Sequence, residues 1–363
     1  MARKRIIYQS EALYAGKTGV AAPTQLHRIQ DVSHSVEVTR TDVNEFGKLA
    51  ALSREVIESP TVSLDFTYFI VDGINEKNLG FTIDGSTSAL SGIMKENTVE
   101  AEKNYFILTV PEGEDASDGS ANYGAGANNG AIGIGNGYIT SYGMTASVGD
   151  IPSASVSVEA SNLRFDTASS GIPNPAINVE NGNPLGGTVS IPTSSTGTLS
   201  AAALRPGDVT IDFGSSNLQM GGAILPGMTA AGKSTANVQN FSLDLPLSRT
   251  PLNRIGNVFP FSRELDFPIN ATLSVSANLT DLSSGTLQEL ICSEASTRDI
   301  TITMNNRCGG GTSVIYTMKS AQLDSQNMSS TIGDNKSVDL TFSTQIGGPS
   351  DTSNGVFISG DNS

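Results

Sequence analysis

The sequence predicts a mostly β protein: two tandem β-sandwich or barrel domains, each with one short flanking α-helix. Three observations predict this fold class. Of 363 residues only 16% are charged, Trp is absent and Gly reaches 38, a composition that suits strands and turns better than long solvated helices. Apolar residues alternate with polar ones in several segments, as in strands with one buried face. The alternating segments also occur twice.

The repeat is the main feature of the chain. At an offset of 209 residues, 29–68 matches 238–277 without a gap, and ten of the forty pairs are identical, where about two or three would follow from ordinary residue usage. The period-two pattern is kept where the letters differ. It occupies Val32, His34, Val36 and Val38 in the first copy and Phe241, Leu243, Leu245 and Leu247 in the second. The fold unit is therefore duplicated.

The match resumes after insertions in the first copy. Helical spacing of three and four predicts a short helix in each copy, at Leu90, Ile93 and Met94 and at Leu287, Leu290 and Ile291. Asp84 or Ser86 is the expected cap of the first helix, and Ser283 or Ser284 of the second. Further strands are predicted at 105–110 and 154–158 in the first copy and at 300–304 and 338–342 in the second.

These matches divide the chain into four parts. Residues 1–165 form the first domain with an N-terminal arm, and 235–346 form the second domain. Between them, 166–234 is a Gly-, Ser- and Pro-rich segment in which 209–213 is a possible strand. The polar tail 347–363 is expected to be mobile. Four prolines of the second copy, Pro246, Pro251, Pro260 and Pro268, must lie at strand ends, bulges or edges.

Charge and segment composition limit the function. The net charge is −15, which argues against tight binding to nucleic acid because phosphate contacts need clustered Lys and Arg. We expect no membrane segment and no signal peptide, and therefore synthesis in a cytoplasm. Cys292 and Cys308 are the only cysteines. Plain buried thiols are the default expectation for them, ahead of a disulfide or metal site.

Several segments resemble tail-tube proteins of tailed phages. They are the run 25–30 (QLHRIQ), the loop 40–47 (RTDVNEFG), the strand 61–68 and the segment 142–150 (YGMTASVGD). The resemblance lies in the pattern and covers both copies, but not the middle segment or the tail. It implies a β-sandwich or small barrel with one flanking helix, in rings that stack into a tube. A tandem duplication implies that three chains form a ring of pseudo-sixfold symmetry.

The resemblance also implies partners and a location. The chain would be a structural virion protein of the tail, assembled in the host cytoplasm, and its tube would conduct the genome into the host. It would contact copies of itself, the tape-measure protein, tail terminator and baseplate proteins, and a sheath if the tail is contractile. DNA would pass transiently without specific binding, which an acidic wall favours because it repels phosphate.

Charged and turn residues that recur in both copies are the assembly candidates. An Arg-Glu step sits in a strand of each copy, and adjacent strand residues point to opposite faces, so each should meet a group on a neighbouring strand or subunit. Solvated charge is the plainer interpretation. The Asn and Gly positions are expected in turns. The candidates are Arg40, Asn44, Gly47, Arg54 and Glu55 in the first copy and Arg249, Asn253, Gly256, Arg263 and Glu264 in the second.

The sequence favours neither catalysis nor a cofactor. No acid, base and nucleophile recur together, and His27 and His34 lack a catalytic constellation, so His34 is expected to be a packed or interface residue. The Gly-rich stretch 119–137 lacks the Lys-Ser or Lys-Thr of a phosphate loop. Glu112, Glu114, Asp115 and Asp118 fit no EF-hand and are more simply a solvated loop. We therefore expect no enzyme, cofactor or metal.

Two alternatives to the tube subunit stay open. A ring protein at the end of a tube, such as a terminator or baseplate ring, would share the fold and form a single layer. A β-sandwich adhesin belongs to a different class. The lack of Trp counts against the adhesin, because Trp often supplies the flat ring on which sugars stack.

Overall fold

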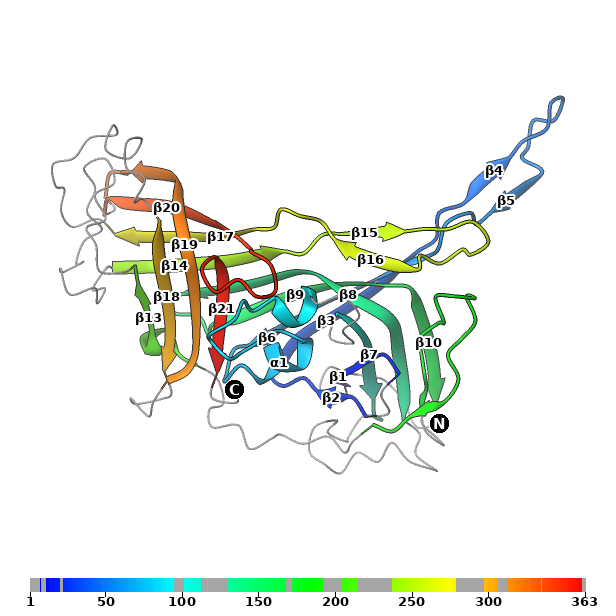
Figure 1. The fold of residues 1–363 in the computed structure, drawn as a ribbon, viewed down its shortest axis with the longest axis horizontal. Coiled ribbons are helices and arrows are strands. Elements are labelled where there is room, and N and C mark those ends of the chain that lie inside the picture. Colours follow the sequence, from blue (N-terminus) through cyan, green and yellow to red (C-terminus); the bar gives the residue numbers. More distant parts are fainter. Residues whose placement is uncertain are drawn as a thin grey trace.

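The computed structural model describes residues 7, 11–19, 22–94, 101–111, 116, 129–167, 172–191, 204–213, 237–278, 297–305, 312–333 and 335–360. Within these residues the fold is mostly β, as predicted, with two short helices and one short 3-10 turn. Figure 1 shows long strands that form a curved body, and a hairpin that projects from one end of it.

The first part of the chain contributes eleven strands and both helices. The helices are α1 (Ile74–Leu79) and α2 (Ser91–Met94). The strands are β1 (Glu11–Lys17), β2 (Thr24–Gln25), β3 (Ile29–Glu37), β4 (Thr41–Val43), β5 (Ser53–Glu55), β6 (Thr61–Phe69), β7 (Glu102–Thr109), β8 (Gly130–Ser147), β9 (Ser153–Ala160), β10 (Asn162–Thr167) and β11 (Ile172–Pro173).

The remainder contributes the 3-10 turn η2 (Pro206–Asp208) and ten strands. The strands are β12 (Thr188–Val189), β13 (Val209–Asp212), β14 (Asn237–Pro246), β15 (Arg249–Leu252), β16 (Ser262–Leu265), β17 (Asn270–Asn278), β18 (Arg298–Asn305), β19 (Thr312–Ser329), β20 (Ser337–Gln345) and β21 (Gly355–Gly360).

One antiparallel sheet runs through both copies of the repeat. Its strands follow the order β3-β6-β9-β8-β14-β17-β20-β19, which we call the main sheet. The first four strands belong to the first copy, and the last four are their counterparts in the second. The two copies therefore join edge to edge, where β8 pairs with β14.

The long strands β8 and β19 each belong to two layers. The final part of β8 lies in the main sheet, whereas its first part pairs with β7 and β10. In the same way, the first part of β19 pairs with β18 and β21. Each copy is thus a two-layered β unit whose layers share one long strand (Figure 1).

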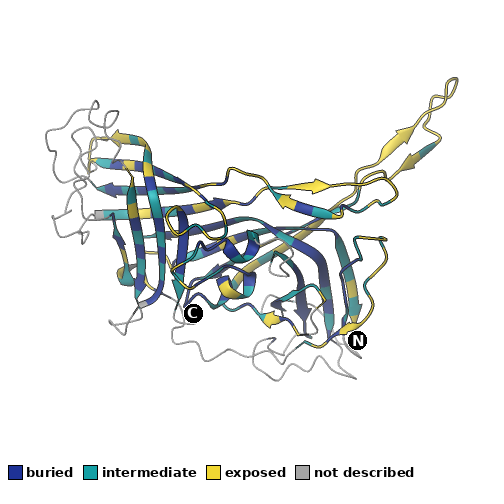
Figure 2. Ribbon diagram, in the orientation of Figure 1, coloured by how far each residue is buried: buried dark blue, intermediate teal, exposed yellow. Residues whose placement is uncertain are grey.

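Alternation in the sequence places the core between these layers. In β6 and β17 every second residue is buried and the intervening residues are more exposed, because successive side chains of a strand point to opposite faces. Figure 2 shows the same alternation along the main sheet. One hydrophobic cluster includes buried residues of both copies, such as Leu64 and Leu273.

A buried carboxyl group helps to join the copies. Glu76 of α1 is 1% exposed, and its Oε1 accepts hydrogen bonds from the hydroxyls of Tyr68 (2.8 Å), Tyr142 (3.1 Å) and Tyr316 (3.1 Å). The hydroxyl oxygens of Tyr142 and Tyr316, which come from different copies, also lie within hydrogen-bond distance of each other, at 2.9 Å. Burial raises the pKa of Glu76 above its ordinary value, against the opposing effect of the hydroxyls.

Several expectations are corrected by the structure. Residues 355–360 of the supposedly mobile tail form β21, in which Val356, Phe357 and Ile358 are buried. The helix α1 was not predicted, because six residues between two glycines give too short a periodic pattern. Asp84 does not cap α2, because α2 begins at Ser91. The Asp84 carboxylate instead accepts hydrogen bonds from the backbone N–H groups of Ser86 and Thr87.

Other expectations agree with the structure or lie outside it. The expected strands appear as β3, β6, β7, β9, β18 and β20, the first helix as α2, and the strand in the middle segment as β13. The second predicted helix, at 287–291, lies outside the described residues, as do Cys292 and Cys308. No helix within the described ranges is long and apolar enough to cross a membrane.

We predict that the Glu76 cluster makes stability depend on pH. The folded-state pKa of Glu76 is raised, whereas the unfolded value is about 4.3. The folded protein therefore holds an extra proton between these values, and stability falls as pH rises through that window. Glu76→Gln should remove this pH-dependent decrease in the free energy of unfolding, because glutamine does not titrate. Glu76→Ala leaves three buried hydroxyls without their acceptor and should lower the free energy of unfolding by about 3 kcal/mol at low pH.

Urea unfolding of the wild type and of Glu76→Gln at about pH 5 and about pH 8 measures the effect. The free energy of unfolding of the wild type should decrease relative to that of the variant at the higher pH. An unchanged difference would show that Glu76 does not titrate in this range.

Candidate assembly surfaces

On the outer face of the main sheet, the strands themselves contribute carboxylates and no Lys or Arg. The main-sheet segments 29–37, 61–69, 139–147, 153–160, 237–246, 270–278, 322–329 and 337–345 contain no Lys or Arg. Their inward positions are chiefly apolar, and their outward positions are chiefly Ser, Thr, Asn, Asp and Gly. This makes a broad polar surface that is neutral or negative.

Strand register places three aspartates on this outer face. Asp65 lies opposite Ser157, Asp244 opposite Gly143, and Asp339 opposite Ser276. All three residues are exposed. Partial burial raises the pKa of Asp244 above its ordinary value, because desolvation disfavours the charged form.

The β8–β14 junction shows how one copy of the repeat covers the edge of the other. Leu243 lies opposite Met144 and Leu245 opposite Tyr142 in the antiparallel register. All four side chains are 1% exposed or less. The pairing thus satisfies the backbone groups of two strand edges and buries the apolar face of β14.

The corresponding edges at the two ends of the main sheet are open. Within the described residues, β3 pairs with β6 alone, and the 323–329 part of β19 pairs with β20 alone. Val36 is the counterpart of Leu245 but is 47% exposed, against 1%. At the other end, Met328 is the counterpart of Met144 and is 37% exposed, against 0%. The same positions that are buried at the junction are uncovered at the ends.

His34 is therefore not packed inside the chain. Its counterpart Leu243 is buried, but His34 is exposed on β3, with its ring 6.4 Å from that of Phe165. Its expected role in an interface stays a prediction.

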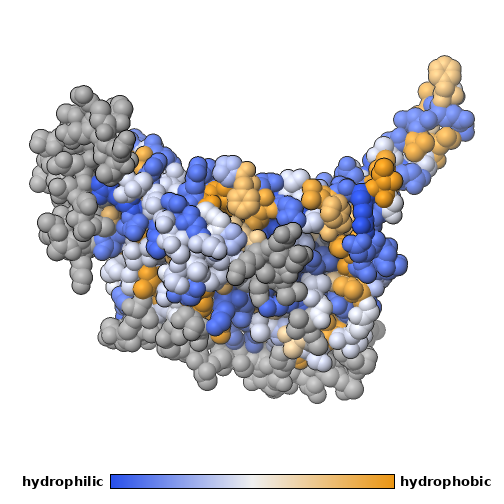
Figure 3. All heavy atoms as spheres, viewed as in Figure 1, coloured by the Kyte–Doolittle hydropathy of each residue, from blue (hydrophilic) through white to orange (hydrophobic). Residues whose placement is uncertain are grey.

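Each copy extends a two-stranded hairpin beyond the main sheet. We call the β4–β5 hairpin with its connecting loop (40–55) the first arm, and the β15–β16 hairpin (249–265) the second arm. The first arm projects into solvent, whereas the second arm lies along the body (Figure 1). Apolar side chains gather on the first arm (Figure 3), and Phe46 and Leu49 near its tip are fully exposed.

The candidates of the first arm are all exposed. Arg54 forms an ion pair with Asp42 on the adjacent strand, at 2.7 Å. This agrees with the expectation that it meets a neighbouring strand rather than Glu55. Gly47 has φ +90 in the turn at the tip, a conformation that favours glycine. Arg40, Asn44 and Glu55 lie along the same hairpin.

The candidates of the second arm meet the first copy. Arg263 is 5% exposed, and its Nη1 forms an ion pair with Glu159 Oε1 of β9. The Arg249 guanidinium lies 5.0 Å from the ring centre of Tyr138 and donates to the Ile139 carbonyl oxygen at 3.4 Å. Burial lowers the pKa of Arg249. The buried Arg263 and the half-buried Arg249 therefore hold the second arm against β8 and β9.

The other second-arm candidates lie at its surface. Glu264 accepts from the Ser262 hydroxyl, and Asn253 is exposed. Gly256 has φ +95, as expected of a turn. Near the tip, Arg254 Nη2 pairs with Glu180 Oε2 at 2.7 Å, so the middle segment supports this arm.

The segments considered above for metal or phosphate binding provide no such site within the described residues. No group of three His, Cys, Asp or Glu side chains there could hold a metal ion. Residues 130–137 of the Gly-rich stretch belong to β8 instead of a phosphate loop. A Cβ on Gly135 would lie 2.3 Å from the Pro175 carbonyl oxygen, so close packing accounts for this glycine. The four acidic residues 112, 114, 115 and 118 lie outside the described residues.

Sequence reasoning missed the acidic sheet face and the contacts that Arg249 and Arg263 of the second arm make with β8 and β9. The face could have been found by noting that the alternating segments lack Lys and Arg throughout. The arm could not, because Ser-Arg-Glu occurs identically in both copies, and Glu159 lies 104 residues from Arg263.

Comparisons with known proteins give distant structural similarities. No family model matches the chain, and no curated protein matches it. Among solved structures, it is similar to a chain of the anti-feeding prophage cap, the tube-terminating cap, with 14% identity and a TM-score of 0.27 over 44% of this chain and 93% of the other. It is also similar to a chain of the anti-feeding prophage baseplate, with 14% identity and a TM-score of 0.29 over 44% of this chain and 95% of the other.

We predict that equivalent arginines of the two arms differ in their effect on folding. Arg263→Ala should lower the free energy of unfolding by about 2 kcal/mol, because it removes a buried guanidinium with its packing and leaves the half-exposed Glu159 without its ion pair. Arg54→Ala, the matched control, should lower it by less than about 1 kcal/mol because its ion pair is exposed. Denaturant unfolding of dilute protein measures both values, and equal losses would contradict the different environments of the arms.

Proposed function

We propose that this chain is a structural subunit of a phage tail tube, in which three copies close head to tail into a ring and the rings stack. The observation that carries the proposal is the β8–β14 junction inside the chain. It pairs the trailing edge of one copy of the repeat with the leading edge of the next. The two open edges, β3 and β19, are the same leading and trailing edges.

Pairing β3 of one chain with β19 of the next would repeat the internal junction. Applying the repeat offsets to its register puts His34 opposite Met328 and Val36 opposite Gln326. The contact would cover the exposed apolar face of β3 and satisfy both rows of unpaired backbone groups. It is heterologous, so it forms a closed ring only if its rotation closes. Six similar junctions, three within chains and three between them, would give pseudo-sixfold symmetry.

The outer face of the main sheet suits the wall of the central channel. If the main sheet continues from chain to chain around the ring, the outer face of every chain points to the same side of that sheet. The strands contribute Ser, Thr and carboxylates without Lys or Arg, and Arg263 of the second arm is already paired with Glu159. Such a face would repel the DNA backbone and offer few phosphate contacts. DNA could then pass without being held. We propose that Asp65, Asp244 and Asp339 face the channel.

The remaining partners follow from this role. The tape-measure protein would occupy the channel during assembly, and terminator and baseplate proteins would contact the end rings, with a sheath outside if the tail is contractile. The protein would reside in the tail of the virion after assembly in the host cytoplasm. No catalytic step or cofactor is part of this function.

We predict that blocking one edge prevents ring closure, while two differently blocked chains still form one junction. A lysine at Val36 or at Met328 places a charge on one open edge, which opposes strand pairing. Each variant alone should stay a folded monomer because both positions are exposed. A mixture should give a one-to-one dimer, since Val36→Lys keeps a working β19 and Met328→Lys a working β3.

Sedimentation velocity of each variant and of the mixture measures these species, and Val36→Thr is the control that should still assemble. Rings from either lysine variant, or no dimer in the mixture while the wild type forms rings, would show that other surfaces join the chains. A wild type that stays monomeric at every concentration would contradict the tube function itself.

A further inference from the structure

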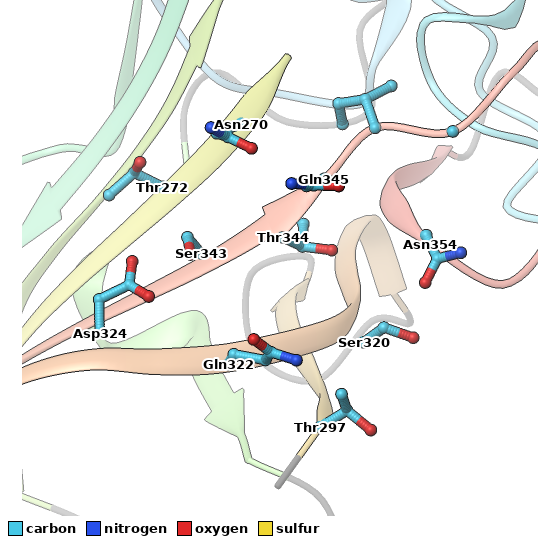
Figure 4. A pocket seen from close by; sticks show the side chains of 12 residues that line it. Asn270, Thr272, Thr297, Ser320, Gln322, Asp324, Ser343, Thr344, Gln345 and Asn354 are labelled. Carbon is cyan, nitrogen blue, oxygen red and sulfur yellow. The ribbon is translucent and has the colours of Figure 1, made fainter. Parts of the chain in front are cut away.

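A polar hollow lies on the second copy at the place where the first copy holds the second arm. The hollow has a volume of about 760 Å³. Figure 4 shows its lining side chains, which come from β17, β19, β20 and adjoining loops. Gln322, Asp324 and Ser343 are among them.

Strand register identifies the equivalent surface in the first copy. Tyr138 lies opposite Glu159 in the β8–β9 pair, and Gln322 lies opposite Ser343 in the β19–β20 pair. Both pairs have a register shift at the next step, between Ile139 and Ser141 in one and between Leu323 and Ser325 in the other. Gln322 and Ser343 therefore occupy the places of Tyr138 and Glu159.

In the first copy this surface is covered by the second arm. The Arg249 guanidinium lies over Tyr138, and Arg263 pairs with Glu159. Just before the arm, the Leu247 N–H donates to the Thr140 carbonyl oxygen at 2.8 Å. In the second copy, no described segment lies in the hollow, because a third copy of the repeat would be needed to supply an arm. The first arm meanwhile projects away from the body, at the opposite end of the main sheet from β19 (Figure 1).

We propose that the first arm of one chain docks in this hollow on the next chain, in the way the second arm docks within its own chain. This rests on the proposed ring and specifies its second contact. The residues that correspond to Arg249 and Arg263 are Arg40 and Arg54, which thereby reach Gln322 and Ser343 of the neighbour. Ser343 stands in the place of Glu159 but has no carboxylate. Asp324, at the register shift of β19, corresponds to Thr140 and supplies an acidic group in the wall of the hollow.

Charge and exposure favour this occupant. Asp324 is exposed and lies in the wall of the hollow, and Arg40 is exposed at the base of the arm. Docking would bring opposite charges together and shield the apolar side chains along the arm. It would also extend the contact made by β3 and β19, since the arm continues directly from β3.

Site-directed cross-linking tests the proposal. In the full chain with Cys292→Ser and Cys308→Ser, one variant carries Arg54→Cys and Ser343→Cys, and a short bismaleimide is added to assembled protein. We expect products between chains that end at the covalent trimer. The pair Arg263→Cys and Glu159→Cys is the internal control and should react within one chain. The pair Lys48→Cys and Ser343→Cys should not react, because the counterpart of Lys48, Asn257, contacts the middle segment at Val179 instead of the sheet.

The outcomes separate this proposal from the ring itself. If electron microscopy shows rings and the internal control reacts, but the Arg54 and Ser343 pair gives no product between chains, the arm docks elsewhere and the proposal is wrong. Equal reaction from Lys48 would also overturn it, since the arm would then have no fixed register. If no rings form under any condition, the tube function fails, and the docking site fails with it.

Discussion

The antiparallel pairing of β8 with β14 is the contact on which the rest of the structure depends. It makes two copies of a repeat into one continuous sheet and places Tyr142 beside Tyr316 over the buried Glu76. It also determines which edges of that sheet are left uncovered. A tandem repeat joined edge to edge always ends in one leading and one trailing edge, and these are complementary because the chain has already paired such edges once.

The fusion of the two copies explains why equivalent residues have different surroundings. Arg263 is buried and Arg54 is exposed, although both lie in a Ser-Arg-Glu step. The second arm has a first copy to pack on within the same chain, and the first arm has none. Joining the copies covalently also removes the cost in translational and rotational freedom from half of the junctions in the proposed ring. The remaining junctions must form by association.

Much of the fold could be predicted from sequence, because its strands follow the simplest pattern. Period-two alternation in 61–69 and 270–278 gives both the strands and the buried face, and the repeat offset predicts which strands correspond. Short elements without such a pattern were missed, such as α1, or misjudged, such as β21, whose buried Val356 and Ile358 depend on pairing with β19. For the assembly surfaces, the sequence predicted which residues matter but not what surrounds them. The environment of Arg249 and the opening at Gln322 depend on contacts distant in sequence, whereas the acidic face could have been found from the lack of Lys and Arg in the alternating segments.

The most direct measurement of the central claim is cryo-electron microscopy of the protein assembled from purified chains, viewed along and across the axis. The account predicts rings of three chains with pseudo-sixfold averages, stacked into a hollow tube with Asp65, Asp244 and Asp339 toward the channel. A single unstacked ring would assign the protein to the end of a tube. Isolated monomers, or assemblies in which the acidic face lies outside and β3 does not pair with β19, would contradict the account.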